Sequence, residues 1–284
     1  MNDNKIVYLK SGTRISFVIL SWNSGKYLRN CLNSASSFCS NENIPCEFIV
    51  IDNGSQDNSI SILKNYSEKY PQLFKVLYLG VNKGTTYSRN LAIRKANGQY
   101  ICILDSDTEF IRGSLEPIIA LLHQHPEVGI IAPKLILEND KIQISVKKFP
   151  TFWIKMLNLS KIIFQIHIKN LESYEDFPFK TIWAVDSAIS ACWFFRKDLI
   201  GQVGFFDEKI YYSPEDLDFC MRVRKAGKQI LYYPYLEVRH YTQQVTHKKP
   251  LSSLSFSHFF GLLYYFHKHG CWISNKKSSH PYQP

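Results

Sequence analysis

Asp105 and Asp107 are two carboxylates one residue apart that follow the apolar run Tyr100 to Leu104. Side chains at positions i and i+2 of an extended chain share a face, so both acids can reach one small volume. A hard divalent cation suits that volume, because Mg²⁺ typically combines one or two carboxylates with phosphate oxygens of a substrate. The alternative is a solvated Asp-Ser-Asp turn, since Asp and Ser are common turn formers.

Three other apolar runs end in residues that suit a nucleotide. Trp22 offers a flat face for a base, and Asp52 can accept a hydrogen bond from a base or a ribose, while Lys83 follows the third run. Asp105 would reach the ribose and Asp107 the metal at the diphosphate. Each residue also has a purely structural interpretation: Trp22 as a core aromatic and Asp52 as a turn residue.

A second group of acids, Glu215, Asp216 and Asp218, follows Ser213 and Pro214. Ser at the N-cap and Pro at the first position predict a helix start, and acids in a first turn are favoured by the helix dipole without any catalytic role. Three acids in four positions exceed what capping needs. A carboxylate kept ionised at a cleft is what a general base requires.

The elements that must position these groups are strands that alternate with helices. Strands are predicted at the four apolar runs, residues 15–21, 46–51, 74–79 and 100–104, with helices after the first three and Gly98 ending the third. Such units favour a parallel, doubly wound α/β sheet, in which ligands bind at the carboxyl ends of the strands. Trp22, Asp52, Lys83, Asp105 and Asp107 would therefore converge on one crevice. Arg89, in the third helix, faces either phosphate or solvent.

The chain of 284 residues, with 45% hydrophobic content, can bury a substantial core. Seven cysteines without a CxxC pair indicate reduced core thiols of a cytosolic protein. No signal sequence and no membrane span is predicted. The net charge of +10 is compatible with nucleic acid, acidic lipid or a nucleotide substrate. No GxGxxG or GxxxxGK[ST] motif is present, which argues against a nicotinamide enzyme or a P-loop kinase.

Four motifs taken in order resemble family 2 glycosyltransferases of GT-A fold. They are Ser16 to Asn23, Val50 to Asp57, Asn82 to Gly84 with Arg89 to Ala92, and Asp105 to Asp107. The resemblance implies an NDP-sugar donor and an Asp-x-Asp site for Mg²⁺ or Mn²⁺. The residues matched to the donor site are Ser21, Trp22, Asn23, Asp52, Lys83, Gly84, Arg89 and Asp105.

The same resemblance extends to the second half of the chain. Asp216 matches the base of an inverting displacement, Glu215 would support the acceptor, and His240 would join Asp107 at the metal or diphosphate. This half is most similar to the bacterial rhamnosyltransferase-type branch, which builds surface polysaccharides, often on lipid-linked acceptors, and dTDP-rhamnose is one candidate donor. Residues 188–191 depart from the branch, where a Gly-containing turn is usual. The absence of a Gln-x-x-Arg-Trp motif favours transfer of a single sugar.

Five regions are predicted from these patterns: an N-terminal tail (1–14), a nucleotide-sugar half (15–138), a basic and aromatic insertion (139–180), an acceptor and catalytic-base half (181–246) and a C-terminal helical tail (247–284). No acid follows Glu237. The basic, aromatic tail would pack on the domain or attach the cytoplasmic protein to the inner face of the cell membrane.

Two rival functions remain at this point. A sugar nucleotidyltransferase would use the same sheet and acids but needs a Gly-rich phosphate loop, of which residues 22–26 are a poor example. A nucleic-acid-binding protein would account for the charge but not for acids at strand ends. We therefore expect no nucleic-acid partner.

Overall fold

The computed structural model describes residues 14–157, 172–174, 177–242, 253–271 and 280–282. The expected N-terminal tail, apart from residue 14, lies outside this range, as do Lys248, Lys249, Lys276 and Lys277 of the C-terminal tail. Among the described residues, no helix is both long enough and apolar enough to cross a bilayer.

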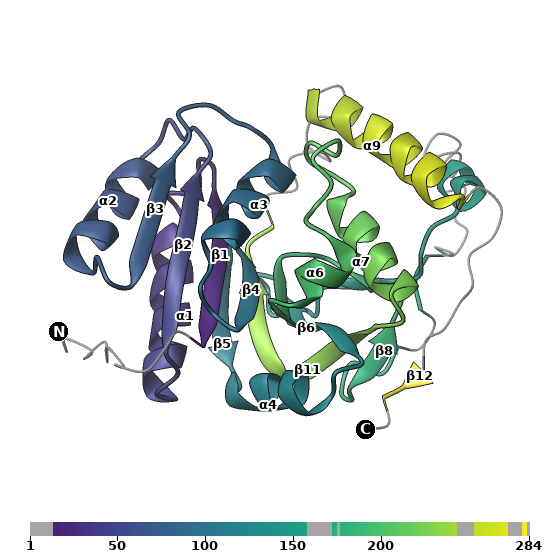
Figure 1. Ribbon diagram of the computed structural model, residues 1–284, viewed down its shortest axis with the longest axis horizontal. Coiled ribbons are helices and arrows are strands. Elements are labelled where there is room, and N and C mark those ends of the chain that lie inside the picture. Colours follow the sequence, from purple (N-terminus) through teal and green to yellow (C-terminus); the bar gives the residue numbers. More distant parts are fainter. Residues whose placement is uncertain (1–13, 158–171, 175–176, 243–252, 272–279, 283–284) are drawn as a thin grey trace.

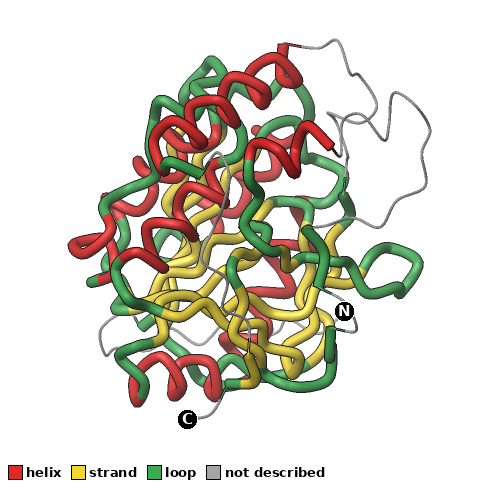
Figure 2. The backbone as a smooth tube through the Cα atoms, turned by 90° about the vertical axis from the view of Figure 1, so that its right-hand side faces the viewer, coloured by secondary structure: helices red, strands yellow, loops and turns green. Residues whose placement is uncertain are grey.

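A mixed, mostly parallel sheet forms the centre of the molecule, and helices lie outside its strands (Figures 1 and 2). The described chain runs in the order β1 (Ile15–Ser21), α1 (Leu28–Asn41), β2 (Cys46–Asp52), α2 (Ser59–Lys69), β3 (Phe74–Tyr78), α3 (Thr85–Lys95), β4 (Tyr100–Asp105), β5 (Thr108–Arg112), α4 (Glu116–Gln124), β6 (Val128–Ile136), β7 (Val146–Lys147), β8 (Trp183–Val185), β9 (Ser187–Ala188), β10 (Cys192–Arg196), α6 (Leu199–Val203), α7 (Glu215–Lys225), β11 (Gln229–His240), α9 (Ser253–His269) and β12 (His280–Pro281). The strand order is β12-β8-β11-β6-β10-β4-β1-β2-β3, with β5 paired to β11. The predicted α/β class is confirmed.

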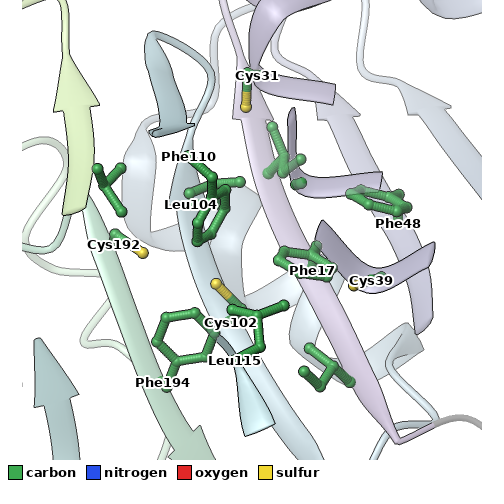
Figure 3. Packing of buried hydrophobic residues seen from close by; sticks show 14 of the residues in the cluster. Phe17, Cys31, Cys39, Phe48, Cys102, Leu104, Phe110, Leu115, Cys192 and Phe194 are labelled. Carbon is green, nitrogen blue, oxygen red and sulfur yellow. The ribbon is translucent and has the colours of Figure 1, made fainter. Parts of the chain in front are cut away.

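Strand residues alternate between two hydrophobic cores because successive side chains point to opposite faces of a sheet. Phe17, Phe48 and Cys102 pack on the face covered by α1, α2 and α4 (Figure 3). Val18 and Ile103 pack on the other face, beneath α3, α6, α7 and α9. Helices on both faces make the sheet doubly wound, and they leave the strand ends free to carry polar groups.

The predicted cysteine environment agrees with the structure. All seven are free thiols, and six of them are buried. Cys102 and Cys192 line the core shown in Figure 3, among phenylalanine and leucine side chains. Cys102 lies on β4 and Cys192 on β10, which pair directly, and both thiols belong to the core on this face of the sheet.

Two predicted boundaries were wrong. Gly98 does not end α3, which stops at Lys95; instead, a Cβ on Gly98 would lie 2.6 Å from the backbone nitrogen of Ser16, so this glycine permits close approach to β1. The run Gln229 to Tyr233 followed by Pro234 predicts a strand that stops before the proline, but β11 continues to His240. An irregularity in its pairing between Tyr233 and Glu237 contains Pro234, which lacks an amide hydrogen to donate.

Candidate active site

The carboxyl ends of β1, β2 and β4 lie side by side. Ser21 is in register with Asp52, and Leu20 is in register with Asp105. Asp52 and Asp105 therefore flank the end of β1, where Trp22 begins the loop toward α1. Parallel pairing alone brings these three sequence-predicted residues to one edge of the sheet.

The Asp52 carboxylate is buried, with 1% of its surface exposed. Its Oδ1 accepts hydrogen bonds from the backbone N–H groups of Gly54 (3.2 Å) and Ser55 (3.1 Å). Its Oδ2 is buried without a hydrogen-bond partner among the described residues. A buried acceptor without a donor is costly, so a ligand N–H or O–H at this position would be favoured. Trp22, 40% exposed, adds an open aromatic face beside it.

Ser21 and Asn23 hold the surrounding loops together. The Ser21 hydroxyl is buried and lies 2.8 Å from that of Ser24. Asn23 has a left-handed backbone (φ 49°), donates its N–H to Ser55 Oγ and accepts the N–H of Gln56 at 2.8 Å. These contacts connect the loop after β1 to the loop after β2, and they fix the position of Trp22 between the two.

Lys83 and Gly84 lie in the loop between β3 and α3, which contacts the second half of the chain. Lys83 is exposed, and its N–H donates to Asn53 Oδ1 at 2.8 Å. Gly84 has φ 87°, and a Cβ there would lie 2.5 Å from the carbonyl oxygen of Tyr211. Thr85 donates its N–H to that same oxygen at 2.7 Å. A glycine is needed for this approach, and sequence reasoning did not identify Tyr211 as its partner.

Asp105, Asp107 and His240 form a cluster whose candidate ligand atoms all lie within 4.8 Å of one another. His240 Nε2 lies 3.5 Å from Asp107 Oδ1. Its Nδ1 lies 2.9 Å from Gln143 Oε1, which suits a proton on Nδ1 and leaves the lone pair of Nε2 available to a metal ion. Two carboxylates and one imidazole fit a Mg²⁺ or Mn²⁺ ion. Gln143 had no sequence signal, because its role depends on a contact across 97 residues.

Arg89 connects the cluster of Asp105, Asp107 and His240, called the metal-type cluster, to the start of α7. Only 4% of its side chain is exposed. One terminal nitrogen donates to Asp105 Oδ1 at 2.8 Å, and the other donates to Glu215 Oε1 at 2.9 Å and to Ser190 Oγ at 2.8 Å. The solvent-facing alternative for Arg89 is therefore wrong. Carboxylates separated by 110 positions in the chain meet around one guanidinium.

Glu215 and Asp216 begin α7 beside this guanidinium. Burial and the charge of Asp216 raise the pKa of Glu215 to about 8, although Arg89 opposes the increase. Burial also raises the pKa of Asp216 above its usual value, while the N–H of Leu217 and the charge of Lys147 act in the opposite direction. Burial thus opposes the ionisation that a helix dipole favours in these two acids.

The predicted N-cap at Ser213 was wrong. Pro214 holds the cap position without a side-chain hydrogen bond, and the Ser213 hydroxyl instead lies 2.9 Å from Nδ1 of His258 on α9. Asp218, the third acid of the group, is 1% exposed and pairs with Lys268 and His269 of α9. Burial raises its pKa, but these partners and Arg222 lower it to about 2 overall. Asp218 therefore attaches α9 to α7, and both helices can be followed in Figure 1.

Helix α9 braces the loop that leads to Glu215 and Asp216. A Cβ on Gly261 would lie 2.3 Å from the carbonyl oxygen of Ser213. Tyr264 and Lys268 reach Asp207 at 2.9 Å and 2.6 Å. The C-terminal helix is thus in direct contact with the segment between β10 and α7, a relationship that helical periodicity could not predict.

Gly261→Ala tests this brace. The added methyl must displace Ser213 and the loop carrying the two acids, and a misplacement of about 1 Å near a reacting centre can lower the rate by up to about 100-fold. Alanine otherwise favours a helix, so propensity alone predicts stabilisation. The matched control is Gly201→Ala in α6, where nothing lies within 4 Å of the added Cβ. Equal turnover in both variants would exclude the brace.

Comparisons with known proteins bear on the same region. The family model described as Glycosyl transferase family 2 matches residues 16–204. An N-acetylglucosaminyl-diphospho-decaprenol L-rhamnosyltransferase from Mycobacterium tuberculosis is 23% identical over 276 residues, which cover 90% of this chain and 85% of the relative. The uncharacterized glycosyltransferase YibD from Escherichia coli is 31% identical over 113 residues, or 40% of this chain and 31% of that protein.

Solved structures share the fold. S. aureus TarS 1–349 matches with a TM-score of 0.57 and 19% identity, over 81% of this chain and 60% of that one. GalNAc-T7, solved with UDP, GalNAc and Mn²⁺, matches with a TM-score of 0.60 and 13% identity. The match covers 92% of this chain and 56% of the GalNAc-T7 chain. The chain thus spans less than two thirds of these two structures and under a third of YibD.

Proposed function

Because this chain belongs to glycosyl transferase family 2 and is a glycosyltransferase, we propose that it transfers one sugar from an NDP-sugar to a hydroxyl of a growing surface glycan, with inversion at the anomeric carbon. The predicted family and GT-A fold are confirmed. One observation carries the proposal. Arg89 bonds Asp105 of the metal-type cluster and Glu215 beside Asp216, so the donor and acceptor groups share one site.

The nucleotide would bind at the ends of β1, β2 and β3. The unpartnered Oδ2 of Asp52 suits a base N–H or a ribose hydroxyl, and Trp22 supplies a stacking face. The fold neighbour TarS has been solved with UDP and with UDP-GlcNAc, which supports a nucleotide-sugar donor for this chain. The rhamnosyltransferase relative makes dTDP-rhamnose a specific candidate.

Asp107 and His240, with Asp105, would hold a Mg²⁺ or Mn²⁺ ion, whose charge would offset that of the departing diphosphate. Asp216 would accept the proton of the acceptor hydroxyl. In the same step, the hydroxyl oxygen would bond to the anomeric carbon of the donor while the bond from that carbon to the diphosphate breaks. Glu215, whose pKa is about 8, would be largely protonated at pH 7 and could donate a hydrogen bond to the acceptor.

The acceptor would be lipid-linked, as the name of the mycobacterial relative states for that protein. Helix α9 exposes Phe256, Phe259 and Phe260, at 55%, 50% and 64%, while Tyr265 and Phe266 on the same helix are buried. An exposed aromatic face beside the catalytic loop would suit peripheral contact with the inner face of the cell membrane from the cytoplasm.

Replacing Phe256, Phe259 and Phe260 together by serine tests this contact. Membrane binding scales with buried apolar area, so we expect co-sedimentation with anionic vesicles to fall by about 10-fold or more. Ile60→Ser with Tyr235→Ser removes exposed apolar groups elsewhere and serves as the control. Sedimentation that is independent of anionic lipid in the native protein would end the proposal of membrane contact.

The proposed transfer is tested by incubating the protein with UDP-, dTDP- and GDP-sugars, with and without Mn²⁺, and identifying the released phosphate compound. We expect a free nucleoside diphosphate, released faster when metal and acceptor are present. Release of pyrophosphate from a nucleoside triphosphate would identify a nucleotidyltransferase and contradict the proposal.

A further inference from the structure

The basic insertion of residues 139–180 contributes a short strand to the acceptor side of the site. In the pair β7–β9, Val146 is in register with Ala188 and Lys147 with Ser187. The Ser187 hydroxyl donates to the carbonyl oxygen of Lys147 at 2.9 Å. Two residues beyond β9, Ser190 Oγ lies 3.3 Å from Glu215 Oε1. Lys147 is thus on a strand fixed to the segment that contacts the catalytic acids.

Alternation along β7 directs Lys147 away from the core. Val146 is buried in the cluster beneath α7, so its neighbour Lys147 points to the opposite face of the short sheet and is half-buried. Its ammonium acts on the Asp216 carboxyl and lowers the pKa of that group. Among the charged groups that lower this pKa, Lys147 acts most strongly.

Two other described lysines of this region, unlike Lys147, pair with a side chain. Lys155 pairs with Glu172 at 2.7 Å, and Lys148 lies over the Tyr174 ring, 5.6 Å from its centroid. Within the described part of the chain, no carboxylate oxygen lies within 4.0 Å of the Lys147 ammonium. A half-buried cation with no counter-ion is suited to a ligand that carries negative charge.

The surrounding charges indicate whether this anionic ligand would belong to the donor or to the acceptor. The nucleotide edge at β1, β2 and β3 lies at one end of the strand order, whereas β9 contacts α7 and β11. An anionic acceptor approaching Asp216 would meet the negative charges of Asp105, Asp107 and Asp216. The Lys147 cation, which acts on Asp216, would offset this repulsion.

We propose that Lys147 binds an anionic group of the acceptor, a phosphate or a carboxylate next to the attacked hydroxyl. This inference rests on the proposed function and adds to it the chemical class of the acceptor. A lipid-linked sugar diphosphate and a uronic acid both offer such a group. Lys147 is then an acceptor-binding residue whose removal penalises charged acceptors and spares neutral ones.

The experiment compares Lys147→Met, Lys147→Arg and the adjacent control Lys148→Met. The acceptors are N-acetylglucosaminyl diphosphate on a short prenyl chain, octyl N-acetylglucosaminide and octyl glucuronide. For Lys147→Met we expect KM to rise about 10-fold or more for whichever charged acceptor the native enzyme uses, without a change for the neutral one. Lys147→Arg should restore most of the loss, and Lys148→Met should behave like the native enzyme.

Two outcomes would overturn the inference while leaving sugar transfer intact. An equal fall in kcat with charged and neutral acceptors, accompanied by a shifted pH profile, would mean that Lys147 only tunes Asp216. Unchanged kinetics in Lys147→Met would mean that it binds nothing. The native enzyme's preference between the diphosphate and the glucuronide identifies the source of the charge.

A binding measurement keeps the inference testable if none of these acceptors is used. Calorimetry measures the binding of geranyl diphosphate to the protein. EDTA is added so that no metal ion mediates binding at Asp107 and His240. We expect the native chain and Lys148→Met to bind it, and Lys147→Met to bind at least about 10-fold more weakly. Equal affinities, or no binding by the native chain, would contradict the inference, whereas failure of every donor in the nucleotide-release assay would contradict the proposed function instead.

Discussion

Asp216→Asn is expected to lower kcat by about 10³-fold while leaving donor affinity within about twofold of the native value, because general-base catalysis contributes roughly 10² to 10⁴. The amide is nearly isosteric with the carboxylate and can still accept the N–H of Leu217. It cannot take a proton from the acceptor hydroxyl. Steady-state kinetics and NDP binding, measured on the same preparation, separate the two effects.

The pH dependence gives this variant a second readout. A carboxyl group whose pKa is raised stays protonated to a higher pH, so the native kcat should fall on the acid side at a higher pH than for an ordinary aspartate. That acid limb should disappear in Asp216→Asn. Asp198→Asn, which changes a 63% exposed acid at α6, is the control. Loss of donor affinity together with turnover would contradict the assignment of Asp216 as base.

Asp107→Asn should abolish metal-dependent donor binding and lower kcat/KM by about 10³-fold or more, since a metal ion supplies several kcal/mol of charge stabilisation to a departing diphosphate. The variant keeps a polar group near His240 Nε2 but loses the charge. Titration with Mn²⁺ and NDP by calorimetry measures the loss directly.

Glu109→Gln is the matched control, because this acid lies two residues further on, in β5, and hydrogen-bonds Tyr241 instead of joining the cluster. It should bind Mn²⁺ and NDP as the native protein does. Retention of Mn²⁺-dependent NDP binding in Asp107→Asn would show that the metal is held elsewhere.

Local patterns in the sequence predicted the sheet and the edge that carries the site. Apolar runs that stop at Asp52 and Asp105 identify both strands and their carboxyl ends, and parallel register then brings the two acids together without further information. The same patterns located α7, since acids and Pro214 at a helix start are local signals.

Contacts between distant segments could not be predicted in this way. Arg89 meets Glu215 across 126 residues, and Asp218 meets His269 across 51. Neither pair has a spacing that distinguishes a buried bridge from two solvated charges. The same holds for Gly261, whose reason for lacking a side chain is the carbonyl of Ser213 in another element.

Diffraction from crystals grown with Mn²⁺ and the NDP product, recorded at the manganese absorption edge, tests the central claim most directly. We expect one anomalous peak in direct bonding contact with Asp107 and His240 Nε2 and with a diphosphate oxygen. We also expect that the open space between that diphosphate and Asp216 is wide enough for one sugar. A manganese peak away from these residues, or a nucleotide bound where Asp216 cannot face the anomeric carbon, would contradict it.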